Sequence, residues 1–500
     1  MSSDADADTE VVTTDKLDAT VLKIALVVVL GAVMSILDTT VVTVAIPTFQ
    51  ARFGTSYTVA AWTMTIYTLA LATVIPLTGW GADRFGTKRP FMLALGLFTV
   101  GSVLCSTAGN IGELLTFRAI QGLGGGMIMP LGMTIVTKAA GPQRMGRLMA
   151  VLGAPMLLGP VCGPILGGWV IEVASWRWIF LINLPIGIAA LISARIVLPR
   201  DLPQPTERFD LLGMLLLSPG LAIFLFGVSQ IPVMGTIAAA RVLIPAAIGI
   251  VLILVFVWHA LRNRFPLLDL RLFRNRSLTT AVITVLVFAA AFYGAGLLIP
   301  SYFLQIRGQS TLHAGLLIAP EGFGAMVAIP IAGMLIEKTG PGRIVPFGIA
   351  LIGAGLAVLT QVGPDTSYAL LLSALFVIGV GMGFTMMPLM TGALRTLSPH
   401  ETARGSTMMN IIQQTGASIG TATMSVILTT LIKNSEFAGP AVASRQNPAI
   451  AHALPPGALE TGLHHAATAF GHTFTVATIL IAVTFLTALF LPRNKTLAEP

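Results

Sequence analysis

The sequence predicts an all-α, polytopic membrane protein built from two related halves. Of its 500 residues, 55% are hydrophobic and only 10% are charged, whereas soluble domains carry roughly 25% charge. The segment GWGADRFGTKR at 79–89 returns as GMLIEKTGPGR at 333–343, each copy between two apolar runs. A duplicated set of membrane helices with a site at their interface is typical of a secondary transporter rather than of a membrane-anchored enzyme.

Fourteen spans follow from the apolar runs, because a helix needs ~20 mainly apolar residues to cross the hydrocarbon. They are predicted at 21–46, 59–80, 91–108, 113–137, 146–171, 178–198, 211–231, 241–261, 279–304, 314–336, 344–362, 368–394, 405–432 and 468–491. With the N-terminus in the cytoplasm, most of the 29 Lys and Arg residues fall on the inner side. This asymmetry follows the positive-inside rule and places both termini in the cytoplasm of a cell-membrane protein.

The predicted organisation is two bundles of six helices with an insertion between them. Its parts are a disordered cytoplasmic tail at 1–20, an N-terminal six-helix bundle at 21–198, an inserted transmembrane hairpin at 211–261, a cytoplasmic linker at 262–278 and a C-terminal six-helix bundle at 279–491. The basic linker is expected to lie on the membrane surface, with Phe265, Leu267, Leu270 and Phe273 toward lipid.

Charge and composition argue against several other classes. The net charge of +8 is distributed among the loops rather than gathered on one face, so no nucleic-acid partner is expected. Cys105 and Cys162 fall inside predicted spans and are expected to be small packing residues. The predicted outer loop at 433–467 contains histidines without Cys or paired carboxylates at ligand spacing, which favours solvated side chains over a metal site.

The repeated segment is expected to form a conformational latch. Its candidate residues are Gly79, Asp83, Arg84, Gly86 and Arg89 in the first copy and Glu337, Gly340 and Arg343 in the second. Asp83 can accept from backbone N–H groups at the start of a neighbouring helix, and the cations can bind carboxylates or lipid phosphates. A tight turn, whose glycines permit positive φ and whose cations only set orientation, is the alternative.

Two charged residues inside spans form the candidate coupling site. Arg118 lies seven residues from the outer start of its helix, about 10 Å into the hydrocarbon. Such an arginine should face the bundle interior and have a partner. Asp38 lies at comparable depth in the first span and is the natural partner. A proton that binds Asp38 would release Arg118, whereas the alternative is a static ion pair.

Glu321 is the third candidate for proton coupling. It follows Pro320 inside the predicted tenth span, so a protonatable group in a cavity is the first hypothesis. A neutral glutamic acid that hydrogen-bonds a neighbouring helix is the alternative.

Glycine and proline recur in the predicted fifth span. The candidate residues of this motif are Gly159, Pro160, Gly163, Pro164, Gly167 and Gly168. Glycines every four residues let another helix approach closely, and prolines bend the helix axis, which predicts a shaped cavity wall or simple packing. The run GLGGG at 122–126 has no preceding strand, so close helix packing explains it better than nucleotide binding.

Eight residues could furnish an apolar substrate cavity with a few polar contacts. The candidates are Trp62, Met64, Tyr67, Met386, Met387, Asn410, Gln413 and Gln414. An apolar cavity with a few polar contacts accepts varied ligands. Most of these residues could equally be packing residues.

Together these strings resemble the fourteen-spanning drug:proton antiporters of the major facilitator superfamily, the EmrB/QacA-like branch. LDTTVVTVAIP is similar to the family's first-span motif, GWGADRFGTKR to motif A, LLTFRAIQGLGGG to motif B and GPVCGPILGGW to motif C, and SWRWIFLINLPIG matches a further signature. The resemblance implies that Asp38 and Arg118 are the coupling carboxylate and the motif B arginine. Gly81, Thr87 and Ala150 depart from the usual motifs, which affects details of the hinge.

The expected function is therefore export of lipophilic, often cationic, drugs or toxic compounds in exchange for protons, which would contribute to antibiotic resistance. Protons and membrane lipids are the other expected partners, and a monomer without a cofactor is expected. Export of an endogenous lipid, siderophore or metabolite is the main alternative. No HExxH, GxSxG or zinc spacing supports an enzyme, and a receptor would not need buried Asp38, Arg118 and Glu321.

Overall fold

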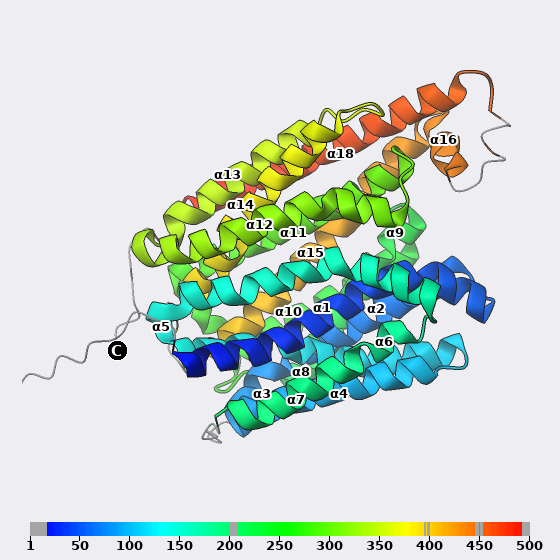
Figure 1. The fold of residues 1–500 in the computed structure, drawn as a ribbon. Coiled ribbons are helices and arrows are strands. Elements are labelled where there is room, and N and C mark those ends of the chain that lie inside the picture. The colour runs from blue at the N-terminus through cyan, green and yellow to red at the C-terminus, as the bar shows by residue number, and fades with distance from the viewer. Residues whose placement is uncertain are drawn as a thin grey trace, which may run out of the picture.

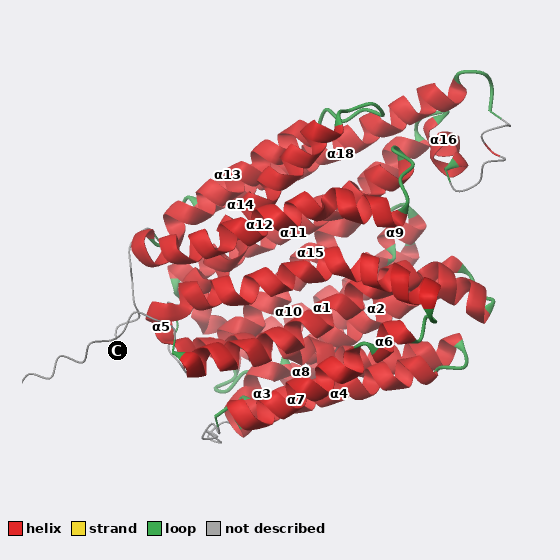
Figure 2. Cartoon of the chain, in the orientation of Figure 1, coloured by secondary structure: helices red, strands yellow, loops and turns green. Residues whose placement is uncertain are grey.

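A computed structural model describes residues 18–199, 209–394, 397, 401–445, 450 and 454–492. Within these ranges it does not describe the side chains of residues 57, 58, 141–162, 164, 165, 232, 311, 312, 337, 338, 391 and 402. The described residues form helices and contain no strand (Figure 2). The predicted all-α fold is confirmed, whereas nearly all of the predicted tail at 1–20 lies outside the described residues.

Figure 1 shows the order of the helices along the chain. In chain order they are α1 (Ala19–Phe53), α2 (Tyr57–Val74), α3 (Leu77–Phe85), α4 (Lys88–Thr107), α5 (Ile111–Val173), α6 (Trp178–Leu181), α7 (Asn183–Val197), α8 (Leu211–Ser229), α9 (Ile231–Met234), α10 (Ala240–Arg262), the 3-10 helix η1 (Leu270–Arg274), α11 (Arg276–Gln305), α12 (Thr311–Thr339), α13 (Pro341–Leu359), α14 (Tyr368–Leu394), α15 (Thr402–Lys433), α16 (Ala438–Ser444) and α18 (Ala458–Ala488).

Twelve helical segments of the described chain are long and apolar enough to cross a membrane, and a bent pair raises the count to 13. The bent pair is α2 with α3, which meet at 50° where the sequence predicts one span at 59–80. Pro76 stands at the bend. Proline has no N–H to donate to the preceding turn, so the helix breaks there.

Helix α5 joins two spans that the sequence separates, because the intervening backbone is also helical. A straight helix of 63 residues would be ~95 Å long, about three times the hydrocarbon thickness. Along its length α5 touches α1 in the order Arg118 with Asp38, Gly132 with Val28 and Gly163 with Thr40. It therefore runs along α1 toward the start of that helix and then returns.

The helices of the first and last parts of the chain lie in two adjoining groups, blue to teal and green to red in Figure 1. Helices α1, α4, α5 and α7 pack together in the first group, and α11, α13, α14, α15 and α18 in the second. Between the groups, α5 packs against α12 and α15 against α3. Helices α8 and α10 form a hairpin whose α8 contacts both α2 and α15, so the hairpin touches both groups.

The segment after this hairpin is buried in protein where the sequence predicts lipid contact. Leu267 is only 3% exposed and packs in a cluster with Ile75, the C-cap of α2, and Ile411 of α15. Its backbone N–H donates to Asp210 Oδ2 at 3.0 Å. The orientation predicted for Leu267 is therefore wrong, because the hairpin and the two groups supply an apolar surface that replaces lipid.

The two copies of the repeated segment share a backbone conformation. Gly86 has φ 77° and ψ 170°, and Gly340 has φ 76° and ψ 164°. Each glycine ends one helix and precedes the next. Glycine adopts positive φ without steric cost, so the duplication predicted from the sequence is also present in the geometry.

Each copy also docks on the last long helix of its own group. Lys88 Nζ donates to the carbonyl oxygens of Arg195 and Leu198 at the end of α7, at 2.8 and 2.5 Å. In the second copy, the N–H of Gly342 donates to the carbonyl of Pro492, just after α18, at 3.1 Å. The repeat therefore fixes equivalent helix ends in both groups.

The segment predicted as a long outer loop at 433–467 is partly helical, as α16 and the start of α18 show. His464 and His465 lie within α18, and Ser435 Oγ is 3.1 Å from His465 Nδ1. In the described part of this segment the histidines thus lie on or beside helices.

Candidate functional site

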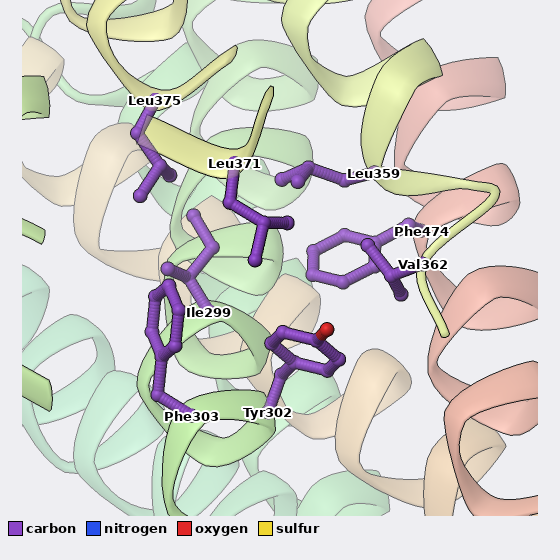
Figure 3. A pocket seen from close by; sticks show the side chains of 8 residues that line it. All are labelled: Ile299, Tyr302, Phe303, Leu359, Val362, Leu371, Leu375 and Phe474. Carbon is purple, nitrogen blue, oxygen red and sulfur yellow. The ribbon is translucent and has the colours of Figure 1, made fainter. Parts of the chain in front are cut away.

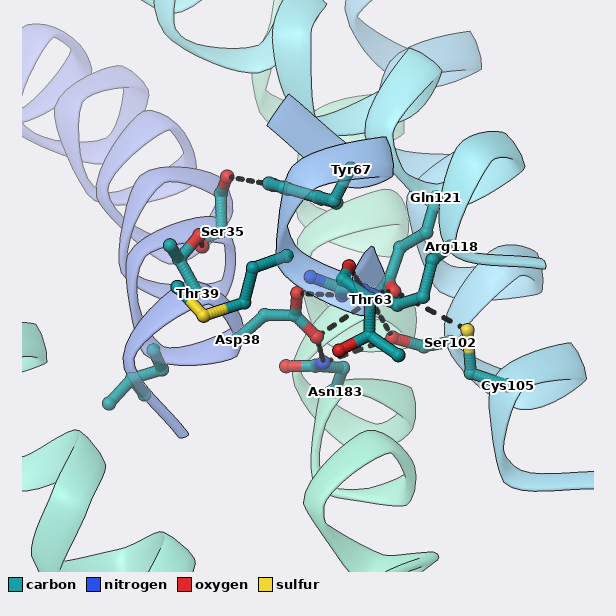
Figure 4. A network of polar contacts seen from close by, with 12 residues as sticks. Ser35, Asp38, Thr39, Thr63, Tyr67, Ser102, Cys105, Arg118, Gln121 and Asn183 are labelled. Carbon is teal, nitrogen blue, oxygen red and sulfur yellow. Dashed lines mark hydrogen bonds and ion pairs between the residues drawn. The ribbon is translucent and has the colours of Figure 1, made fainter. Parts of the chain in front are cut away.

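The structure brings Asp38 and Arg118 together inside the first helix group (Figure 4). Arg118 Nη1 donates to Asp38 Oδ2 at 2.5 Å, and both side chains are 0% exposed. Asp38 comes from α1 and Arg118 from the first pass of α5. A paired, enclosed charge is the arrangement that an arginine within a membrane span requires.

Two amide side chains complete the coordination of Asp38. Gln121 Nε2 donates to Asp38 Oδ1 at 2.7 Å, and Asn183 Nδ2 donates to the same oxygen at 3.0 Å. Both amides also donate to Ser102 Oγ, at 2.6 and 2.9 Å. Gln121 Oε1 accepts from Arg118 Nη1 at 2.7 Å. The carboxylate is thus held by donors from α5 and α7, with α4 behind them.

Helix α2 encloses the guanidinium from the other side. Arg118 Nε donates to the carbonyl of Thr63 at 3.1 Å. The ring of Tyr67 lies 4.3 Å from the guanidinium carbon, and its hydroxyl shares a hydrogen bond with Ser35 Oγ at 3.1 Å. Tyr67 is 2% exposed. It belongs to the ion-pair network, where its face stabilises a desolvated cation, rather than to the predicted cavity wall.

The glycine run after Arg118 allows this close arrangement. A Cβ on Gly122 or Gly125 would overlap Tyr67, and one on Gly124 would overlap the backbone of Phe98 in α4. These glycines therefore bring α5 close to both α2 and α4. That approach lets Arg118 reach α1 and α2 at the same time.

The glycines of the motif at 159–168 hold the return pass of α5 against α1. A Cβ on Gly163 would overlap Thr40, and one on Gly167 would meet Val41 at 2.9 Å. Both contacts are within one helical turn of Asp38. Gly168 faces open space. The side chains of Pro160 and Pro164, like the surroundings of Gly159, lie outside the described residues, so the predicted cavity wall stays a prediction.

Sequence reasoning missed three polar members of the network. Gln121 lies three residues after Arg118 and so shares its helix face, a spacing from which its role could have been predicted. Asn183 is a polar residue within the apolar string LINLPIG, and intramembrane polar residues are often functional. Ser102 gave no comparable signal.

The first copy of the repeated segment lies across the two helix groups. Asp83 Oδ2 is 3.4 Å from Arg404 Nε, and Thr78 and Thr407 share a hydroxyl hydrogen bond at 2.8 Å. A Cβ on Gly79 would meet the Thr407 hydroxyl at 3.3 Å. Arg404 and Thr407 lie in the first two turns of α15. Asp83 thus lies at the start of a neighbouring helix, where an arginine side chain is a partner, and acceptance from backbone N–H groups stays a prediction.

The other predicted latch residues are at different places. Arg84, Arg89 and Arg343 are exposed. Gly340 ends α12, and the side chain of Glu337 is outside the described residues. The contacts between Asp83 and Arg404 and between Thr78 and Thr407 thus come from the first copy.

Glu321 lies apart from the Asp38 network. It belongs to α12, and its backbone carbonyl faces Gly379 of α14 so closely that a Cβ there would overlap it. Its side chain forms no hydrogen bond or ion pair with another described residue. The structure does not bring it to Asp38 or Arg118.

The remaining cavity candidates occupy several places. Trp62 packs on Phe226 of α8 with ring centroids 5.6 Å apart. Gln413 Nε2 donates to the hydroxyl of Tyr293 at 2.9 Å, and Asn410 Nδ2 donates to the carbonyl of Ser406 at 2.8 Å. Met64, Met386, Met387 and Gln414 are partly buried.

A small apolar cavity lies among α11, α13, α14 and α18 (Figure 3). Its wall includes Ile299, Tyr302, Leu371 and Phe474. None of the predicted cavity residues lines it. The predicted substrate cavity therefore stays a prediction.

Two groups of apolar helices, a buried ion pair and a contact between the groups define a polytopic membrane protein of the secondary-transporter class. Residues 28–421 match the Major Facilitator Superfamily. This match covers more than half of the sequence, so the chain belongs to that superfamily.

Relatives and a solved structure agree with this assignment. The chain is 49% identical over 495 residues to a multidrug resistance protein B homolog of Mycobacterium tuberculosis, covering 96% of this chain and 92% of the relative. It is 32% identical over 415 residues to the putative multidrug resistance protein MdtD of Yersinia pestis, covering 81% and 86%. The human organic anion transporter MFSD10 (TETRAN) shares the fold, with a TM-score of 0.62 at 15% identity over 92% of this chain and 99% of that one.

Proposed function

We propose that this protein exports lipophilic, often cationic, compounds, drugs included, across the cell membrane in exchange for protons. The observation that carries the coupling proposal is the enclosed Asp38–Arg118 pair, since a carboxylate that holds a buried cation can change that cation's position when it takes up a proton. The multidrug resistance proteins among its relatives support drugs as substrates. Export of an endogenous lipid, siderophore or metabolite is the second candidate.

We further propose fourteen crossings, as in the EmrB/QacA-like branch. Counting α2 with α3 once and the two passes of α5 separately turns the twelve candidate helices into fourteen. With the basic loops inside, both termini are cytoplasmic. The bundles at 21–198 and 279–491 then form the two moving parts, and the hairpin at 211–261 is an insertion that packs on both.

The proposed cycle couples the ion pair to the latch. In this arrangement α3 packs on α15, which supports a state in which the two groups touch at the proposed inner side. A proton on Asp38 removes the charge that holds Arg118, and an unpaired buried cation is unfavourable by several kcal/mol. That energy favours another arrangement of the bundles, in which the latch opens and substrate enters from the inside.

The test uses everted membrane vesicles that contain the full-length protein. Accumulation of the fluorescent cation ethidium should require a pH gradient, acid inside, and should stop when an uncoupler removes it. Uptake that persists without the gradient would contradict proton coupling. A panel of neutral drugs, lipids and siderophores in the same assay separates a multidrug exporter from a dedicated one, because only the former accepts several unrelated compounds.

Weakening the latch should slow turnover without weakening substrate binding. A partly shielded ion pair contributes about 0.2–1 kcal/mol, so Asp83→Asn is expected to change the transport rate by up to ~5-fold through slower exchange between states. Ethidium binding at equilibrium should stay within about twofold of normal. The charge exchange Asp83→Arg with Arg404→Asp should recover part of the rate, and a large loss of binding in Asp83→Asn would place this segment's role elsewhere.

Glu321 should decide which charges are accepted. Two opposite charges ~10 Å apart at an effective dielectric constant of 20 attract by about 1.7 kcal/mol, more than tenfold in affinity. Glu321→Gln is therefore expected to weaken ethidium export about tenfold while sparing neutral substrates. Equal losses for both classes would instead indicate coupling or packing, and no loss would leave Glu321 a neutral hydrogen-bonding group.

A further inference from the structure

Asn183 has an unused hydrogen-bonding atom beside the coupling carboxylate. Its Nδ2 donates to Asp38 Oδ1 at 3.0 Å and to Ser102 Oγ at 2.9 Å. Its own Oδ1 accepts from no described residue, although the side chain is completely buried. A buried acceptor without a partner is unfavourable and calls for an explanation.

Gln121 is the natural comparison, because it makes the same two donations. Its Nε2 donates to Asp38 Oδ1 and to Ser102 Oγ, at 2.7 and 2.6 Å. Its Oε1, however, accepts from Arg118 Nη1 at 2.7 Å and from Cys105 Sγ at 3.6 Å. These bonds fix the Gln121 amide in one orientation. The oxygen of Asn183 makes no such bond with a described residue and can accept a new one.

A protonated Asp38 needs an acceptor for its new O–H group, since a neutral acid becomes a donor. Next to Oδ2 lies Arg118, which can only donate. Of the titratable groups on the helices around Asp38, Tyr67 of α2 already pairs with Ser35 and Cys105 of α4 with Gln121. Helix α7 presents the amide of Asn183. Of the buried side-chain oxygens described around Asp38, the Oδ1 of this amide is the one with no hydrogen-bond partner.

We propose that Asn183 is a positioning residue whose amide turns over when Asp38 takes up a proton. The proton passes from a hydronium ion to Asp38 Oδ1, which forms one O–H bond and leaves water. The amide rotates by about 180°, and Asn183 Oδ1 accepts the new O–H. Ser102 can follow, because a hydroxyl both donates and accepts. This inference rests on the proposed proton coupling at Asp38.

The position of Asn183 in the chain suits such a motion. It is the first residue of α7, directly after the break that separates α7 from α6. The turning amide thus links the protonation state of Asp38 to the end of a helix. By contrast, Gln121 lies inside α5, ten residues after its first residue.

The test is infrared spectroscopy of the full-length protein in lipid, titrated with pH in the absence of substrate. The carbonyl stretch of protonated Asp38 is identified as the band that Asp38→Asn removes. In Asn183→Leu, which has the same number and branching of side-chain heavy atoms but no polar atoms, this band should move to higher frequency because the O–H group has lost its acceptor. The titration midpoint should change by less than about 0.3 pH unit, since Asn183 serves both protonation states.

Gln121→Leu is the matched control. Gln121 serves only the charged form, so its loss should raise the titration midpoint by about one pH unit or more and leave the band frequency almost unchanged. If Asn183→Leu behaves like Gln121→Leu, or moves neither quantity, the inference is wrong. If no Asp38-dependent band titrates in the unmodified protein, the proposed coupling itself fails. Asn183→Val provides the same test if the leucine variant does not fold.

Discussion

Asp38→Asn is expected to abolish gradient-driven export, by at least ~100-fold, while the protein stays folded in the membrane. The asparagine side chain keeps the shape of the aspartate, and its oxygen can still accept from Gln121 and Asn183. It cannot bind and release a proton near neutral pH, so proton binding can no longer release Arg118. Ethidium accumulation in everted vesicles, normalised to the amount of transporter in the membrane, measures the effect.

The control for this result is Glu113→Gln, which also replaces a carboxylate with an amide. Glu113 is exposed at the start of α5 and accepts from Gly109 and Asn110, so its variant should transport normally. Full gradient-dependent export by Asp38→Asn would remove Asp38 from the coupling step and leave the ion pair as a structural element.

The helical fold and the ion pair could be predicted because membranes impose strict rules. An arginine inside an apolar span must have a partner, and Asp38 stands at the same depth on another helix. The repeated glycines at 86 and 340 likewise mark turns that other residues disfavour. The local sequence and the physics of the bilayer are enough to predict these features.

Other features depend on helix rotation and tertiary packing, which a single apolar segment does not reveal. Tyr67 and Trp62 lie on the same helix and look equivalent in sequence, yet Tyr67 covers Arg118 and Trp62 packs on the inserted hairpin. Leu267 suits lipid and protein surfaces equally well. The sequence also does not predict that α5 is continuous. The charged residues between the spans predicted at 113–137 and 146–171 suit a turn and a helix equally well.

Removing Arg118 should damage stability as well as transport, and the damage should depend on Asp38. Arg118→Ala leaves the Asp38 carboxylate buried without its cation, and breaking a buried pair by removing one partner is destabilising by about 3–5 kcal/mol. Export should be lost as well, because nothing remains for the proton to release. Adding Asp38→Asn should recover part of the stability, because the amide leaves no unpaired charge behind.

The measurement is a double-mutant cycle on unfolding of the purified protein, which does not depend on transport activity. Residues in direct contact usually show coupling energies of about 0.5–3 kcal/mol, and a fully enclosed pair should lie in the upper part of that range. Combining Arg118→Ala with Glu113→Gln provides the control, since Glu113 bonds elsewhere, and those two effects should add. If the effects of Asp38→Asn and Arg118→Ala on the free energy of unfolding also add, the two side chains do not interact in the folded protein. The proposal that protonation of Asp38 releases Arg118 would then have no structural basis.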